Sequence, residues 1–161
     1  MTTLTVDEVR ALRLAGQHAE HLPAARALVR QRPADALAQI EAAWACDRAG
    51  FEHEAITHYD EVYRLGVPAE LHRSFTVGYG STLRNVGRFD DALAILGEAV
   101  AADPEYPAFS AFLALALLSA GHPKAAMAAL LGCALDVARP GAFDGYERAL
   151  ASYHDELLAS P

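Results

Sequence analysis

Apolar residues recur every three or four positions along most of the chain, which is the spacing of a helix that buries one face. Between residues 52 and 65, for example, the apolar positions are Ala55, Ile56, Tyr59, Val62 and Tyr63. Alanine and leucine are the commonest residues and β-branched residues are few, so intrinsic preference also favours helix. No segment shows the pattern of a strand. The sequence therefore predicts an all-α protein.

Glycine and proline interrupt this pattern at nearly constant intervals. The glycines are 34, 37 and 34 residues apart, at Gly16, Gly50, Gly87 and Gly121. The prolines are 35, 36 and 36 residues apart, at Pro33, Pro68, Pro104 and Pro140. Because the two sets alternate, each period of about 35 residues holds two segments long enough for one helix. This punctuation predicts consecutive helical hairpins.

The same breaks bound the predicted helices. Thr5 and Glu8 have the spacing of a capping box, which opens the first helix. The expected helices are 5–17 and 22–31, 35–49 and 52–65, 70–86 and 89–102, 107–120 and 123–138, and a final helix over 143–159.

Small and large residues occupy fixed places within these units, with a glycine at the turn. The unit that matches best has Gly80, Leu83, Gly87, Phe89, Ala92, Leu96, Ala99 and Pro104. The first unit has Pro68 one place late, and the third departs at Pro123 and Pro140. In this spacing and residue pattern the chain resembles the tetratricopeptide repeat family, most strongly over 34–139.

The resemblance implies an all-α, right-handed α-α superhelix, or solenoid, in a single domain over 1–161. It would contain three clear hairpins, a degenerate N-terminal hairpin in which His21 replaces the packed alanine, and a C-terminal capping helix. The corresponding boundaries are 5–33 for the degenerate repeat, 34–68, 69–104 and 105–140 for the clear repeats, and 143–159 for the cap. The alternative is an irregular α-bundle.

The resemblance also implies a concave groove, lined by the first helix of each hairpin, and a non-enzymatic role in binding a protein or peptide. The candidate groove residues are Arg10, Arg13, Ile40, Trp44, Arg48, Val77, Ser81, Arg84, Asn85 and Leu115. Arginine suits two-pronged contact with carboxylates, so the expected partner carries an acidic segment. Two alternatives stay open: neighbours such as Glu41 pair with the arginines, and Trp44 fills a gap between hairpins instead of anchoring a ligand.

Self-association is the second candidate role. Residues 107–118 are apolar all around their helix, which must then be covered on more than one side. The final helix is expected to form a lid over the last hairpin. An incomplete lid would leave apolar surface for a second copy of the chain, giving a homodimer.

Composition excludes other classes of partner. Thirteen Lys and Arg against twenty-one Asp and Glu give a net charge of −8, which argues against nucleic acid and against a basic membrane-surface module. The longest apolar stretch, 108–121, is shorter than the roughly 20 residues of a membrane span. The N-terminus has no secretion pattern, so a cytoplasmic location is expected.

No catalytic residue, cofactor or metal site is expected. Cys46 and Cys133 form no Cys-x-x-Cys pattern, and His53 and His58 are predicted to point to different helix faces. Phosphate-binding loops and nucleophile elbows do not occur. Gly78 lies inside a predicted helix, where it is expected to permit close packing against a neighbour or ligand.

Overall fold

The computed structural model describes residues 3–159, which form α-helices and one short 3-10 helix, with no strand among them. The all-α prediction is confirmed. The chain divides into an N-terminal unit that ends at Val86 and a C-terminal unit that begins at Gly87, and each unit is described by itself. Since this division falls at the turn glycine of the expected repeat 69–104, the repeat boundaries stay a prediction.

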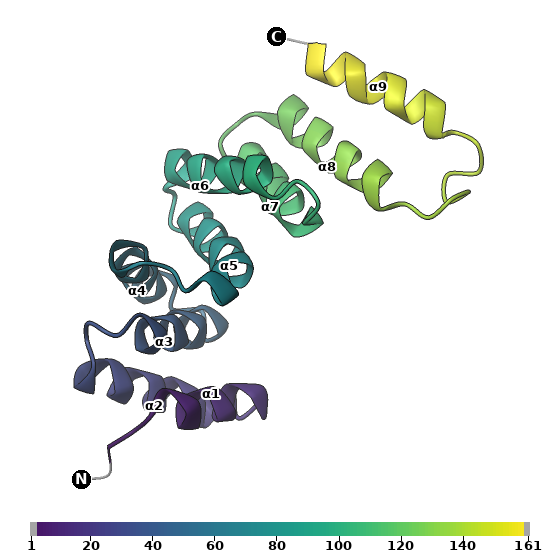
Figure 1. The fold of residues 1–161 in the computed structure, drawn as a ribbon. Coiled ribbons are helices and arrows are strands. Elements are labelled where there is room, and N and C mark those ends of the chain that lie inside the picture. Colours follow the sequence, from purple (N-terminus) through teal and green to yellow (C-terminus); the bar gives the residue numbers. More distant parts are fainter. Residues whose placement is uncertain (1–2, 160–161) are drawn as a thin grey trace. The chain divides into compact units, whose positions relative to one another are not determined.

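The N-terminal unit is a stack of helices in which each element packs on the next (Figure 1). Its helices are α1 (Val6–Leu14), α2 (His18–Gln31), α3 (Ala36–Arg48), α4 (Glu52–Leu65), the 3-10 helix η1 (Ala69–Leu71) and α5 (His72–Asn85). Helix α3 also contacts α1 and α5 and is therefore the central element of the unit.

Side-chain caps and turn glycines set these helix boundaries. The capping box is present: Thr5 Oγ1 accepts from the Glu8 amide at 3.3 Å, and Glu8 Oε2 accepts from the Thr5 amide at 2.8 Å. Asp35 caps α3 in a similar way. Gly50 then ends the α3 segment at φ +77°, a left-handed conformation that glycine adopts without strain.

The C-terminal unit is a second stack, in which α6 packs on α7, α7 on α8 and α8 on α9. Its helices are α6 (Phe89–Ala102), α7 (Pro107–Ser119), α8 (Pro123–Val137) and α9 (Glu147–Ala159). Bilayer-crossing helices do not occur in either unit over residues 3–159, because no helix there is both long and apolar enough.

Three predicted helix starts need correction. Helix α2 begins at His18 and not at 22, and α5 begins at His72 after a 3-10 turn. Helix α9 begins at Glu147 and not at 143, because Gly141, Asp144 and Gly145 all adopt positive φ, which an α-helix does not allow.

Small residues at the helix crossings are buried. Ala55, Ala92 and Ala126 are at most 7% exposed, and the large residues Tyr59 and Leu96 are buried beside them. Leu130 of α8, in contrast, is 50% exposed. The expected lid is also incomplete, because none of the residues of α9 is buried.

Gly78 permits the close approach that was predicted, and the neighbour is Tyr59 of α4. A Cβ atom at position 78 would overlap the Tyr59 hydroxyl, which donates a hydrogen bond to Asp47. Gly97 of α6 is also helical, but a Cβ there would meet nothing within 4 Å. The two glycines therefore form a matched pair.

We predict opposite effects for alanine at these positions. Gly97→Ala should stabilise the protein by up to about 1 kcal/mol through helix propensity. Gly78→Ala should destabilise it, because the displaced Tyr59 hydroxyl is buried and loses its partner. Urea unfolding followed by circular dichroism measures both, and equal midpoints for the two variants would contradict the prediction.

Candidate functional site

The N-terminal unit has a hollow of about 910 Å³ on the side of its first helices, α1, α3 and α5. We call it the N-terminal hollow. It is lined by Arg13, Leu14, Trp44, Asp47, Arg48, Tyr59, Leu71, Ser74, Val77 and Gly78. The lining combines apolar surface with charge of both signs, which is the composition of a site that orients a ligand as well as burying it.

Arg13 and Trp44 form one wall of the N-terminal hollow. The guanidinium carbon of Arg13 lies 4.5 Å from the centroid of the Trp44 ring, within range of a cation–π contact. Arg13 also donates from Nε and Nη2 to the two carboxylate oxygens of Glu41, at 2.9 Å each. Trp44 is half-buried, so the ring both packs against its own chain and lines the hollow.

Glu41 is a buried carboxylate at the back of this wall. It is 1% exposed, and His21 Nε2 lies 3.1 Å from its Oε2 while Arg10 Nε lies 3.6 Å from its Oε1. Burial raises the pKa of Glu41, but the hydrogen bonds and charges of His21 and Arg13 together outweigh it and lower the pKa. Arg10 and Arg13 therefore neutralise a residue of their own chain, one of the two arrangements that the sequence left open.

Asp47 forms the floor of the hollow where α3, α4 and α5 meet. Tyr59 Oη donates to Asp47 Oδ2 at 2.6 Å, and Thr82 Oγ1 donates to Oδ1 at 2.8 Å. Burial raises the pKa of Asp47 despite these two bonds. The carboxylate thus joins three helices while it remains part of the lining.

Arg48 is the arginine that faces the hollow without a partner. It is exposed, and within residues 3–159 it forms no ion pair or hydrogen bond with a side chain. Val77 lines the hollow opposite, from α5. Contact of these residues with a ligand stays a prediction.

The remaining predicted residues lie outside this lining. Arg84 Nη2 donates to Asn85 Oδ1 at 2.8 Å, and Asn85 Nδ2 donates to Glu52 at 3.0 Å, while Arg84 Nε is buried without a partner. Ser81 is half-buried on α5, and Leu115 is 44% exposed on α7 of the C-terminal unit.

Ile40 was expected in the groove and is instead in the core, 1% exposed. The reason is that α1, α2, α4 and α5 all pack on α3. The part of the α3 surface that they leave uncovered is therefore narrower than the exposed face of an ordinary amphipathic helix. A buried side chain of this kind is not available to a ligand.

Sequence reasoning missed the small side of the hollow. Leu71, Ser74 and Gly78 line it together with the predicted Val77, whereas the predicted Ser81, Arg84 and Asn85 do not. The spacing of Ser74 and Gly78, four apart on one helix face, was the available signal, because small residues at that spacing leave room above the helix.

Comparison with known proteins now decides the family. The family model described as "Tetratrico peptide repeat" matches residues 36–157, which is most of the chain. The chain belongs to the tetratricopeptide repeat family. The match begins with α3 and ends within α9, so the expected degenerate hairpin at 5–33 lies outside it.

Two solved structures have a similar fold. One is described as "MamA 41-end from Desulfovibrio magneticus RS-1", with a TM-score of 0.69 and 17% sequence identity over 94% of this chain and 90% of that chain. The other is described as "MamA RS-1 ArsTM double mutant", with a TM-score of 0.68 and 17% identity over 94% and 89%. The search of curated proteins found no match. At this identity the likeness shows the tetratricopeptide repeat fold.

We predict that Glu41 makes the protein sensitive to acid. Since its pKa in the folded protein lies below the ordinary value of 4.5, its contribution to stability is present at neutral pH and is lost as the pH falls through the folded pKa. Glu41→Gln should lower the free energy of unfolding by about 3 kcal/mol at pH 7. This is the lower end of the range for a broken buried ion pair, because Arg13 is a quarter exposed.

Urea unfolding at pH 7 and at pH 3 tests this prediction. The cost of Glu41→Gln should shrink at pH 3, whereas the exposed Glu98→Gln should change little at either pH. A cost that is the same at both pH values would show that the Glu41 charge does not stabilise the fold.

Proposed function

We propose that the protein is a non-enzymatic adaptor whose N-terminal hollow binds a segment of another protein. The family supports a role in protein interaction in general. The observation that carries the proposal is the free Arg48 guanidinium beside Trp44, in a hollow lined mainly by α1, α3 and α5.

The charges in the hollow define the segment that would fit. Arg13 is neutralised by Glu41, and the negative charge of Asp47 would repel a ligand with several acidic residues in a row. Arg48 therefore favours a ligand with a single carboxylate. Trp44, Leu14 and Val77 offer apolar contact next to it. The expected ligand is therefore one acidic side chain flanked by apolar residues, and not an extended acidic tract.

Selection from a displayed library of random peptides tests this proposal without a known partner. The wild-type protein should enrich peptides with one Asp or Glu beside large apolar residues. Arg48→Glu should abolish or reverse the acidic preference, and Trp44→Ala should reduce the apolar one, because each removes one half of the recognition. Arg139→Glu is the matched control, since it makes the same charge change at an exposed position of the C-terminal unit.

Two outcomes would count against the proposal. A consensus that is unchanged by Arg48→Glu would remove the N-terminal hollow as the site. A consensus lost equally in Arg139→Glu would show that net charge, and not this hollow, selects the peptides.

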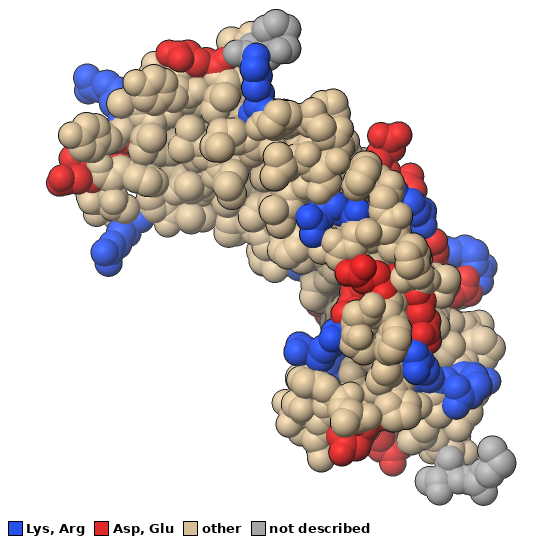
Figure 2. Space-filling model, turned by 180° about the vertical axis from the view of Figure 1, so that it is seen from behind, with Lys and Arg blue, Asp and Glu red and all other residues tan. Residues whose placement is uncertain are grey.

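Self-association is the second candidate function, and the C-terminal unit supports it. Large apolar side chains of α7 and α8 are 44–58% exposed, namely Leu115, Leu118, Met127 and Leu130. Within 107–137 the sequence has only two charged residues, Lys124 and Asp136, and most of the face of this unit that Figure 2 shows carries no charge (upper part of Figure 2). Such a surface fits a second copy of the chain, giving a homodimer.

Light scattering as a function of concentration tests self-association. We expect a dimer at micromolar concentration, and Leu118→Glu should weaken it at least tenfold, because a charge would be buried in an apolar interface. Leu14→Glu is the control, since Leu14 is 73% exposed but belongs to the N-terminal unit. A monomer at high micromolar concentration would eliminate this function.

A cytoplasmic location and the absence of nucleic-acid and membrane partners stay predictions. We propose no reaction and no catalytic residue.

A further inference from the structure

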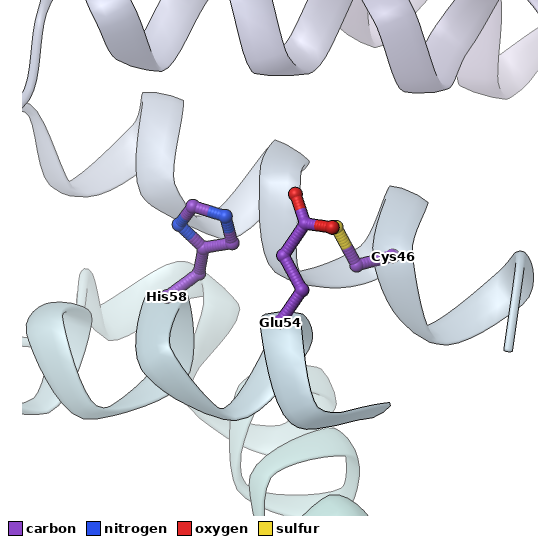
Figure 3. Close-up of side chains that lie close together, drawn as sticks. All are labelled: Cys46, Glu54 and His58. Atoms are coloured by element: carbon purple, nitrogen blue, oxygen red, sulfur yellow. The ribbon is translucent and has the colours of Figure 1, made fainter. Parts of the chain in front are cut away.

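A second cluster of polar side chains lies within the hairpin of α3 and α4, apart from the N-terminal hollow. Cys46 comes from α3, and Glu54 and His58 come from α4 (Figure 3). One sulfur, one carboxylate oxygen and one imidazole nitrogen lie within 4.8 Å of one another. Cys46 is fully buried, whereas Glu54 and His58 are half-buried.

The hydrogen bonds of Gln39 fix the tautomer of His58. Gln39 Nε2 donates to the Pro33 carbonyl at 2.7 Å, so the Gln39 oxygen is the atom that faces His58. His58 Nδ1 lies 2.7 Å from that oxygen and must donate to it, so Nδ1 carries the proton. The lone pair is then on Nε2, which is the ring nitrogen that faces Glu54 in Figure 3.

This arrangement is the one that metal-binding histidines use. A ligating imidazole usually donates its other N–H to a carbonyl or carboxylate, which orients the ring and raises its basicity. Here the chain from Pro33 through Gln39 to His58 supplies that support. Burial also lowers the pKa of His58, which keeps the ring neutral.

We propose that Cys46, Glu54 and His58 bind one zinc ion between α3 and α4. Thiolate and imidazole ligands suit zinc better than magnesium or calcium, which prefer oxygen alone. A thiolate and a carboxylate balance the two positive charges of the ion. Three protein ligands leave the fourth position to water.

Binding exchanges a proton for the ion. Burial, and next the Glu54 carboxylate, raise the pKa of Cys46 to about 12, so the thiol is protonated before binding. Zinc replaces the thiol proton, which is released to solvent, and the sulfur binds as thiolate. The oxidation state of neither atom changes.

Arg26 of α2 competes with the metal for Glu54. Its Nε and Nη2 donate to the two Glu54 oxygens at 2.8 and 2.6 Å. Ligand atoms around a tetrahedral zinc lie roughly 3.5 Å apart, so atoms now up to 4.8 Å apart must approach by roughly 1 Å. Glu54 can make this movement only by giving one oxygen to the metal and leaving its two-pronged contact with Arg26.

Titration of the metal-free full chain with Zn²⁺ against a competing chelator tests the site. We expect one ion per chain, with affinity at least tenfold weaker in Cys46→Ser and in His58→Gln. Cys133→Ser and His53→Gln are the matched controls and should bind like the wild type. Arg26→Gln should bind more tightly, because it frees Glu54; an equal or lower affinity would overturn the competition.

Cobalt gives a second measurement that does not depend on stability. Co²⁺ bound to the wild type and to Cys133→Ser should show thiolate-to-cobalt charge-transfer absorption, and Co²⁺ with Cys46→Ser should not. Circular dichroism checks that each variant is folded. If Cys46→Ser does not fold, His58→Gln, which changes a half-buried residue, remains as the ligand variant. Binding of zinc that is unchanged in both ligand variants, or no binding at one ion per chain, overturns the proposal.

Discussion

The N-terminal unit depends on the polar groups that α3 carries into its interior. This helix is covered by α1, α2, α4 and α5, yet Gln39 and Glu41 lie on its buried surface, and Asp47 is half-buried near its end. A buried polar group without a partner costs more than most single contacts gain. Each of the three therefore fixes a neighbour: Glu41 holds α1 and α2, Gln39 holds α4, and Asp47 holds α4 and α5.

This constraint also decides which arginines are available to a ligand. An arginine near a buried carboxylate is drawn to it, because the pair replaces hydration that the carboxylate has lost. Arg13 and Arg10 meet that need at Glu41, and Arg26 pairs with the half-buried Glu54. Arg48 follows directly after Asp47 but points to the hollow, where the Asp47 oxygens already accept from Tyr59 and Thr82. Arg48 therefore remains unpaired because the hydroxyl groups of Tyr59 and Thr82 already donate hydrogen bonds to Asp47.

Much of the fold could be predicted because its determinants are local. Helices over 52–65 and 89–102 begin and end as expected, since the glycine and proline breaks beside them act within a few positions. The candidate site was harder to predict, because Ile40 lies at helical spacing from Trp44 but is buried by the helices that pack on α3. Pairing of Arg13 with Glu41 joins residues 28 apart, and no local pattern contains that information. The cluster at Cys46 was missed for the same reason, since its ligands come from two helices.

The two units differ in what determines their contacts. The five polar side chains that are fully buried among residues 3–159 all belong to the N-terminal unit: His21, Gln39, Glu41, Thr76 and Thr82. Hydrogen bonds are directional, so such groups allow few alternative packings and favour one defined hollow. The C-terminal unit is held by apolar contacts, which are non-directional and leave Leu118, Met127 and Leu130 about half exposed. It follows that a selective site belongs with the polar interior of the first unit, whereas the second is suited to association that depends on apolar area.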